Sequence, residues 1–318
     1  MRPAAFPAGS LDAPPPRVQD ARSASVGAVP NCPEEDESPM PPRAYDAILL
    51  DLDGTLVADD GTIHPETRRR LHEAAEAGVT VMIATGRSET SAIPAIAALG
   101  IDTPAVIYNG AALYCPRERR LLEEKLLPRP LLDDCLDYAE RFGHMPVVMC
   151  SDSKRALSPR SEAQKMALHD MSHVRLVEPA ELRVERPIRL SLYSEKHGRT
   201  DDFVRELHQE VGDLDAYLTW FPLNLLPAHR ESAFHVIDVQ PRCDGKAEAF
   251  RVLRERYGIP PERTIAIGDA TNDLPMLERA GLAVAMANSM PEVFAVAHRV
   301  IGENHTGTIG ELVRELLL

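Results

Sequence analysis

The 318-residue sequence lacks both a long apolar run and a cluster of basic residues. No stretch approaches the roughly 18 consecutive apolar residues that a transmembrane helix needs, so we expect no membrane span. Lys and Arg total 35 against 49 Asp and Glu, which gives a formal net charge of −14. This balance argues against nucleic acids and anionic membranes as partners, because both carry negative charge and would repel the protein.

Cysteine is scarce and shows no metal-binding spacing. The five cysteines are scattered and form no CxxC pair, so the sequence indicates neither a zinc site nor a disulfide framework. Isolated thiols are typical of the reducing cytoplasm, where we expect the protein to be located. Two catalytic motifs are also missing. Without a GxxxxGK(S/T) loop kinase chemistry is disfavoured, and without a GxSxG elbow a serine nucleophile is not indicated.

The first 43 residues differ in composition from the rest of the chain. They contain ten of the 27 prolines and an acidic run at 34–37, with almost no aliphatic periodicity. Such a segment cannot bury enough apolar surface to offset its loss of conformational entropy, so we predict a disordered tail over 1–43. No continuous apolar region follows Arg2, which argues against a signal peptide. The role of the tail, and whether the chain starts at Met1 or Met40, stay open at this point.

Short apolar runs alternate with helix-like stretches from residue 45 onward. Strands that are buried on both faces of a parallel sheet have this appearance, and helices connect them. We therefore expect an α/β fold, with a Rossmann-like parallel sheet and helices on both of its faces. The expected strands are 47–50, 79–84, 105–108, 264–267 and 282–285, and the expected helices are 65–77, 91–99, 247–257 and 274–280.

This pattern is interrupted between residues 127 and 237, where strands and helices mix and polar residues do not gather at strand ends. The elements expected there are strands at 146–149, 188–193 and 216–220 and helices at 131–142 and 200–211. We interpret 127–237 as an inserted α+β cap domain. Residues 44–126 and 238–318 then form one discontinuous core domain.

Two carboxylates follow the first expected strand, in the hexapeptide DLDGTL at 51–56. Because side chains alternate in an extended segment, Asp51 and Asp53 point to the same side, and Gly54 permits a sharp turn. Two such carboxylates repel each other unless a cation lies nearby. The hexapeptide is therefore either an Asp-Gly turn with a capping Thr, or a metal-dependent nucleophile paired with a general acid and base.

Three more polar groups follow later elements. Thr85 and Gly86 come after the second strand, where a hydroxyl and free N–H groups suit phosphate oxygens. Lys246 precedes a helix in a chain with few lysines, and GDATND at 268–273 offers carboxylates to a hard divalent cation. Each group alone also fits a plain turn, a helix cap or an exposed lysine. Together they are expected to converge, because sites in open α/β sheets form beyond the carboxyl ends of the strands.

These motifs resemble those of the haloacid dehalogenase superfamily of phosphotransferases, and the resemblance covers almost all of 45–318. The matching segments are DLDGTL (51–56), ATGR (84–87), Lys246 and GDATND (268–273). IYNGA (107–111) and GLAVAMANS (281–289) are similar to the Cof-like branch, which carries a large cap between the second and third motifs. The resemblance therefore implies the same division into a core and an inserted cap that the interrupted pattern at 127–237 indicates.

The resemblance also implies a role for each residue. Asp51 is the expected nucleophile that becomes an aspartyl-phosphate, and Asp53 is the expected acid and base. Mg²⁺ is the expected cofactor. The expected phosphate-binding residues are Thr85, Gly86, Lys246 and Asn272, and the expected metal ligands are Asp51, Asp53 (through its carbonyl), Asp269 and Asp273. Asn109 is expected to line the cleft.

The implied function is a Mg²⁺-dependent phosphatase for small phosphomonoesters such as sugar phosphates, FMN or similar metabolites. A phosphomutase with the same aspartyl-phosphate chemistry and a catalytically silent metabolite-binding protein are the alternatives. The negative net charge does not exclude an anionic substrate, because Mg²⁺ and Lys246 would reverse the local field. The sequence does not distinguish a monomer from a homodimer.

Two smaller features complete these expectations. The segment 216–236, which contains Trp220 and Arg230, is either a substrate-facing cap loop or a solvated excursion. We assign no ligand role to His64 or His235.

Overall fold

The structure is a computed structural model that describes residues 43–169 and 171–318. The predicted tail over 1–43 therefore lies outside the described residues, except for its last residue. In the part of the chain that is described, no helix combines the length and the apolar character needed to cross a membrane.

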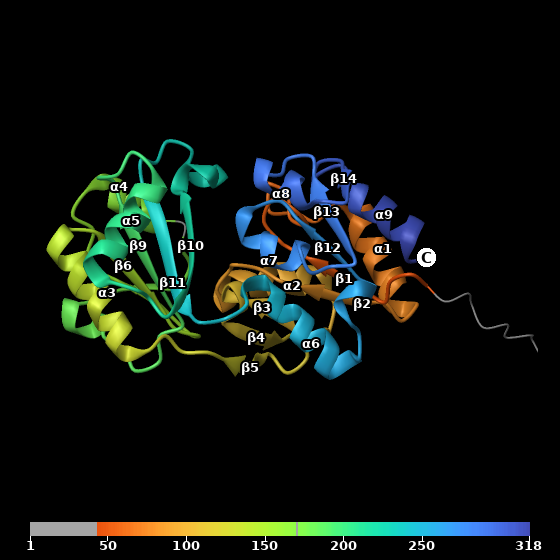
Figure 1. Cartoon of the computed structure of the whole chain (residues 1–318), viewed down its shortest axis with the longest axis horizontal. Coiled ribbons are helices and arrows are strands. Elements are labelled where there is room, and N and C mark those ends of the chain that lie inside the picture. The colour runs from red at the N-terminus through yellow and green to blue at the C-terminus, as the bar shows by residue number, and fades with distance from the viewer. Residues whose placement is uncertain (1–42, 170) are drawn as a thin grey trace, which may run out of the picture. The chain divides into compact units, whose positions relative to one another are not determined.

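Five parallel strands form the first sheet, in the order β14-β13-β12-β1-β2 (Figure 1). Their bounds are β1 (Ala47–Leu50), β2 (Thr80–Ile83), β12 (Thr264–Gly268), β13 (Leu282–Met286) and β14 (Arg299–Ile301). β1 lies at an interior position and pairs with both β2 and β12. All four of its side chains are buried, as expected for a parallel strand that is covered on both faces.

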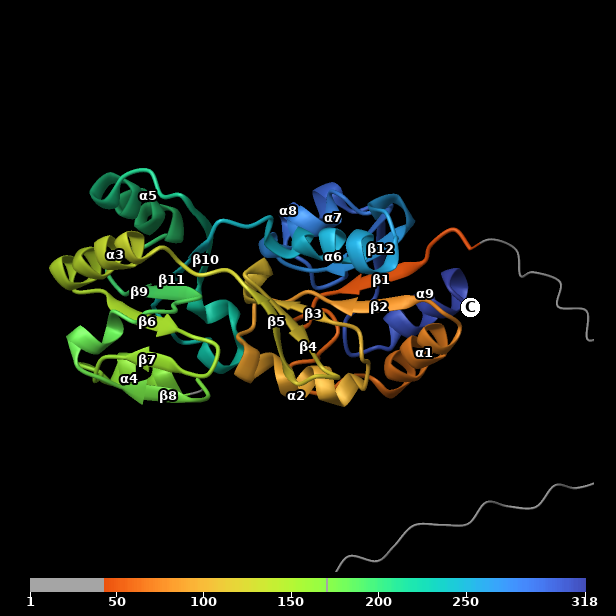
Figure 2. The ribbon, with the colours of Figure 1, turned by 90° about the horizontal axis from the view of Figure 1, so that it is seen from below.

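Helices cover both faces of this sheet. They are α1 (Pro65–Glu76), α2 (Glu89–Leu99), α6 (Glu248–Tyr257), α7 (Leu274–Leu277), α8 (Pro291–Val296) and α9 (Thr308–Leu316). Ile48 and Leu50 of β1 belong to one apolar cluster with residues of α1, α2 and α9, whereas Ala47 and Leu49 belong to a second cluster with residues of α6, α7 and α8. Figure 2 shows these two groups of helices on opposite sides of β1 and β2. The predicted Rossmann-like α/β core is confirmed.

A small antiparallel sheet consists of β3 (Ala105–Ile107), β4 (Ala112–Cys115) and β5 (Arg120–Glu124). The expectation that 105–108 simply extends the parallel sheet needs correction, because among the described residues β3 joins that sheet through a single bridge, Ala84 with Val106. Tyr108 and Asn109 adopt positive φ angles of 51° and 49°. This left-handed pair reverses the chain, so that β4 pairs with β3 instead.

Six strands form the third sheet, in the order β10-β11-β9-β6-β7-β8. Their bounds are β6 (Met145–Met149), β7 (Lys154–Ala156), β8 (Val174–Leu176), β9 (Arg189–Ser194), β10 (Ala216–Pro222) and β11 (His235–Pro241). The neighbouring strands are antiparallel except for β7 and β8. The predicted domain division between 237 and 238 falls inside β11, so we move the proposed end of the cap to Pro241.

Helices α3 (Arg129–Phe142) and α5 (Thr200–Val211) cover one face of the six-stranded sheet (Figure 2). Leu190 and Leu192 of β9 and Val239 of β11 pack there in an apolar cluster with both helices. The short helix α4 (Glu162–His169) precedes β8. Because side chains alternate along a strand, the intervening residues of β9 and β11 point to the opposite face.

Candidate active site

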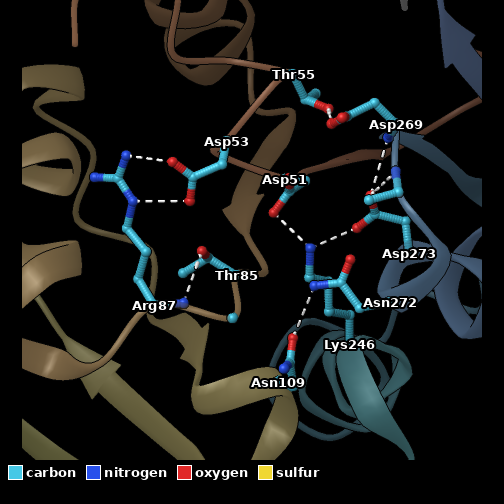
Figure 3. A network of polar contacts seen from close by, with 12 residues as sticks. Asp51, Asp53, Thr55, Thr85, Arg87, Asn109, Lys246, Asp269, Asn272 and Asp273 are labelled. Atoms are coloured by element: carbon cyan, nitrogen blue, oxygen red, sulfur yellow. Dashed lines mark hydrogen bonds and ion pairs between the residues drawn. The ribbon is translucent and has the colours of Figure 1, made fainter. Parts of the chain in front are cut away.

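Polar side chains meet beyond the carboxyl ends of β1, β2 and β12, although they come from distant parts of the sequence (Figure 3). Asp51 follows β1 directly, Thr85 lies two residues after β2, and Asp269 follows β12. The N–H of Asp51 donates to the carbonyl of Ile267 in β12 at 3.1 Å. The register of the sheet therefore fixes Asp51 beside the loop that begins at Asp269.

Lys246 lies between two carboxylates. Its Nζ is 2.5 Å from Asp51 Oδ1 and 2.5 Å from Asp273 Oδ1, and all three side chains are almost fully buried. Burial alone would lower the pKa of Lys246, but the charges of Asp273 and Asp51 outweigh it and raise this pKa. We therefore assign a positive charge to Lys246.

Asp273 uses its second oxygen to shape the loop after β12. Oδ2 accepts hydrogen bonds from the backbone N–H groups of Asp269, at 2.9 Å, and Ala270, at 3.0 Å. The same carboxylate thus holds Lys246 on one side and the loop on the other. This double contact explains why a fully buried aspartate stands at this position.

Asp269 completes a cluster of three acidic residues. Asp51, Asp269 and Asp273 each offer one carboxylate oxygen, and these oxygens lie within 4.8 Å of one another. Thr55 Oγ1 donates to Asp269 Oδ1 at 2.6 Å. Gly54, with φ of +77°, faces the same carboxylate so closely that a Cβ there would collide with it.

The electrostatics of this cluster favour a cation. Burial raises the pKa of Asp269 to about 7, and the charge of Asp273 adds to the effect. Burial also raises the pKa of Asp51 well above its usual range, since Lys246 offsets only part of the penalty and three acidic neighbours increase it. A divalent cation would relieve this excess of negative charge, and carboxylate oxygens are the ligands that Mg²⁺ prefers. The residues present therefore fit the expected metal.

Asp53 stands apart from the acidic cluster. Its carboxylate forms a two-point ion pair with Arg87, in which Nη2 lies 2.6 Å from Oδ1 and Nε lies 2.9 Å from Oδ2. The hydrogen bond to Asp53 raises the pKa of Arg87. The Asp53 side chain is 57% exposed, so it remains accessible to a substrate while Asp51 is buried.

The remaining predicted residues lie around this centre. Thr85 is buried, and its Oγ1 accepts a hydrogen bond from the N–H of Arg87 at 3.1 Å. Asn272 Nδ2 donates to Asn109 Oδ1 at 3.1 Å. The backbone N–H of Asn109 donates to the carbonyl of Thr85 at 3.0 Å. The structure thus joins the loops after β2, β3 and β12 around Lys246 (Figure 3).

The model of one protein family matches residues 48–313, and that family is described as haloacid dehalogenase-like hydrolase. The chain belongs to this family. The resemblance drawn from the four motifs is thereby confirmed, and the matched range includes each of the four motifs described above. The expected enzyme class, a phosphatase of the haloacid dehalogenase-like hydrolases, is confirmed as well.

Individual relatives of this hydrolase span most of the chain. The pyridoxal phosphate phosphatase YbhA of Escherichia coli is 29% identical over 289 residues, which cover 85% of this chain and 98% of its own. The 5-amino-6-(5-phospho-D-ribitylamino)uracil phosphatase YitU of Bacillus subtilis is 28% identical, with coverages of 84% and 96%. The crystal structure of TM0651 from Thermotoga maritima has a TM-score of 0.69 at 25% identity and covers 85% of this chain and 97% of that one.

Sequence reasoning gave no role to Arg87 in this hydrolase, although the residue stands in the quoted ATGR motif. The available signal was its place in that motif, four residues after the end of β2. Trp220 lies on the face of the six-stranded sheet that α3 and α5 cover, since its Nε1 donates to Asp201 of α5 at 3.3 Å. Arg230 lies 3.6 Å from Asp59, in the segment that follows Asp53. The substrate-facing and the solvated interpretations of 216–236 both stay predictions.

Neither of the two histidines singled out in the sequence belongs to the acidic cluster. His64 caps α1, because its Nδ1 accepts the N–H of Glu66 at 3.3 Å. His235 Nδ1 lies 2.6 Å from the hydroxyl of Thr200 in α5.

Proposed function

We propose that this phosphatase hydrolyses small phosphomonoesters with the help of Mg²⁺ and through an aspartyl-phosphate on Asp51. The observation that carries the proposal is the buried Asp51 carboxylate, held 2.5 Å from Lys246 Nζ and within reach of two further carboxylates. A carboxylate attacks an anionic ester only where positive charge screens their repulsion. A bound Mg²⁺ would supply that screening together with Lys246.

The proposed reaction has two steps. First, an Asp51 oxygen bonds to phosphorus while the bond from phosphorus to the ester oxygen breaks, and Asp53 gives a proton to that oxygen. Then Asp53 takes a proton from a water molecule whose oxygen bonds to phosphorus, and the bond to Asp51 breaks, which releases inorganic phosphate. Arg87 contacts both carboxyl oxygens of Asp53 in the free protein, so a substrate must displace this contact, and Asp53 must receive a proton from solvent, before it acts as an acid.

We assign the other residues by their positions around Asp51. Figure 3 shows the labelled residues among them around Asp51. The residues assigned to the phosphoryl oxygens are Thr85, Gly86, Lys246 and Asn272, and those assigned to the metal are Asp51, Asp269, Asp273 and the Asp53 carbonyl.

The cap and the substrate belong to the same proposal. We assign the six-stranded sheet with α3, α4 and α5 to a cap that covers the site and excludes water during phosphoryl transfer. The substrate is a sugar phosphate, FMN or a similar metabolite, supported by relatives that are named for pyridoxal phosphate and for a ribitylaminouracil phosphate. The four cysteines within the described part are free thiols, which supports action in the cytoplasm.

Release of inorganic phosphate from a panel of phosphorylated metabolites tests the proposal. With Mg²⁺ we expect release from several esters, and EDTA is expected to abolish it until Mg²⁺ is added in excess. Product analysis checks that the phosphoryl group reaches water and not another hydroxyl of the substrate. No release from any ester, undiminished release in EDTA, or a product that keeps its phosphate would each contradict the proposal.

A further inference from the structure

The face of the cap sheet that α3 and α5 leave open carries polar side chains that contact the core. Arg189 of β9 donates from Nη1 to the carbonyl of Gly86 at 2.8 Å. The hydroxyl of Thr219 in β10 lies 3.5 Å from Asn109 Nδ2. Three residues of this face form what we call the cap strip, namely Lys154 of β7, Arg189 of β9 and Gln240 of β11.

Arg189 is a buried cation that has an acidic partner. Its Nη1 lies 3.2 Å from Asp238 Oδ2, and both side chains are less than a tenth exposed. The guanidinium also lies over the ring of Tyr108, 5.3 Å from the ring centre. One negative charge therefore compensates the charge of Arg189.

Lys154 is a buried cation without an acidic partner. Its Nζ lies 3.1 Å from Ser91 Oγ in α2, and the residue is 6% exposed. Among residues 43–169 and 171–318, none places a carboxylate oxygen within 4.0 Å of this ammonium. Burial, and to a lesser extent the charge of Arg189, lower the pKa of Lys154 to about 8. An ammonium has three N–H donors, so donor capacity remains for a ligand.

Gln240 is fully buried, yet neither its amide oxygen nor its amide nitrogen has a hydrogen-bond partner within the described part of the protein. Buried polar atoms are nearly always paired, so an unpaired amide calls for an explanation. Gln240 shares a face with Asp238, two residues away, which binds Arg189. In the next strand it pairs with Tyr217, whose hydroxyl approaches Gly245, directly before Lys246.

The cap strip lies on the side of the site where a leaving group would depart. Lys154 contacts the hydroxyl of Ser91, and the carbonyl of Ser91 accepts from Arg87 Nη1 at 3.2 Å. Arg87 in turn holds Asp53, the residue proposed to protonate the leaving oxygen. Two short contacts therefore separate Lys154 from the side chain that holds Asp53.

We propose that the cap strip binds a carboxylate at the end of the substrate that is remote from the scissile phosphate. One positive charge of the strip is uncompensated, which matches a singly charged carboxylate better than a doubly charged second phosphate. The N–H donors of Lys154 would bind the carboxylate. Gln240 lies three strand positions away, across β6 and β9, so its amide would pair with a hydroxyl group nearer the middle of the substrate. This inference rests on the proposed function and narrows its substrate class to phosphate esters of hydroxy acids.

Matched pairs of esters test the inference with the full-length protein and Mg²⁺. Each pair has the same length and differs only in a terminal carboxylate or hydroxymethyl group: phosphoglycolate with ethylene glycol phosphate, 4-phosphoerythronate with erythritol 4-phosphate, and 6-phosphogluconate with glucitol 6-phosphate. We expect at least one pair, of the length that reaches Lys154, to show a kcat/KM about 10- to 100-fold higher for the acid, the range for a hydrogen bond to a charged group. Glucitol 1,6-bisphosphate, compared with 6-phosphogluconate, tests whether the cap strip prefers a second phosphate to a carboxylate.

The variant Lys154→Met is expected to remove this preference, so that the acid-to-polyol ratio of kcat/KM falls about 10- to 100-fold. The ratio is decisive because a merely structural defect would lower both rates together. The matched control is Lys165→Met, which removes an exposed lysine of α4 and is expected to keep the ratio. Gln240→Leu is expected to lower kcat/KM for the hydroxylated acids and their matched polyols alike, and so to keep the ratio.

Failure of this inference differs from failure of the proposed function. If the esters are hydrolysed but no acid is preferred, if the bisphosphate is preferred over 6-phosphogluconate, or if Lys154→Met keeps the ratio, the cap strip does not bind a carboxylate. If the protein with Mg²⁺ hydrolyses neither these esters nor p-nitrophenyl phosphate, the proposed phosphatase mechanism itself fails.

Discussion

Lys246 and Lys154 are both almost fully buried, at 1% and 6% exposure, but their surroundings differ. Lys246 contacts two carboxylates, Asp51 and Asp273, and its pKa is raised. The hydrogen-bond partner of Lys154 among the described side chains is the Ser91 hydroxyl, and burial, with the charge of Arg189, lowers the pKa of Lys154 to about 8. Burial lowers the pKa of both ammonium groups, but the net shifts are opposite because only Lys246 has carboxylate partners that outweigh burial.

This difference separates two kinds of site within one molecule. Around Lys246 the charges are in place before a substrate arrives, as positioning of phosphoryl groups requires. Around Lys154 and Gln240 the polar groups are buried and only partly satisfied, which is unfavourable until a ligand pairs with them. Reaction and recognition would then depend on separate parts of the fold.

The largest expected effect concerns Asp51, the proposed nucleophile. Asp51→Asn removes the attacking oxygen, so we expect turnover of every ester to fall by about 10³-fold or more. Circular dichroism should show an unchanged fold, because the amide is nearly isosteric with the carboxylate. Asp59→Asn, on an exposed neighbouring loop, is the matched control. If Asp51→Asn kept full activity, Asp51 would not be the nucleophile.

Replacing the paired lysine comes next in size. Lys246→Met leaves Asp51 and Asp273 buried without their cation, and removing one partner of a buried ion pair costs about 3–5 kcal/mol of unfolding free energy. Chemical denaturation in EDTA should show this loss, and kcat with Mg²⁺ should fall for acid and polyol esters alike. A variant as stable as Lys165→Met would show that the carboxylates do not depend on Lys246.

Part of the candidate site could be predicted from the sequence, because several of its residues stand in contiguous motifs directly beyond buried strands. Parallel strands of one sheet end at one edge, so Asp51, Thr85 and Asp269 could be placed close together without knowledge of side-chain packing. β3 could not be placed correctly, because its pairing depends on the left-handed turn at Tyr108 and Asn109. A short apolar run does not show whether its partner strand is parallel.

The cap strip could not be predicted in this way. Lys154, Arg189 and Gln240 come from three strands that are separated by dozens of residues, and no motif marks them. Their shared face follows from the sheet register and from which face α3 and α5 cover. Strands β7, β8 and β11 were not expected from the sequence at all. For β7 and β8 the reason is length, because three residues are too few for a periodic pattern.

The smallest expected effect is that of Lys154→Met on the free energy of unfolding. Its sign is opposite to that of Lys246→Met. In the folded protein the pKa of Lys154 is about 8, against an ordinary value of 10.5. Between these values the unfolded chain binds more protons than the folded one, so the unfolding free energy of the wild type rises with pH through this window. Below pH 8 both states are protonated, and the penalty for the buried charge is fully present.

Lys154→Met removes that penalty. At pH 7 we therefore expect the variant to be more stable than the wild type by about 1–3 kcal/mol, and the difference should shrink as the pH rises from 8 to 10.5. Denaturant unfolding at a series of pH values measures the difference at pH 7 and its decrease at higher pH. The difference between Lys165→Met and the wild type should not change with pH in this way. A wild type as stable as Lys154→Met at pH 7 would mean that Lys154 has an acidic partner in solution, and the contrast with Lys246 would disappear.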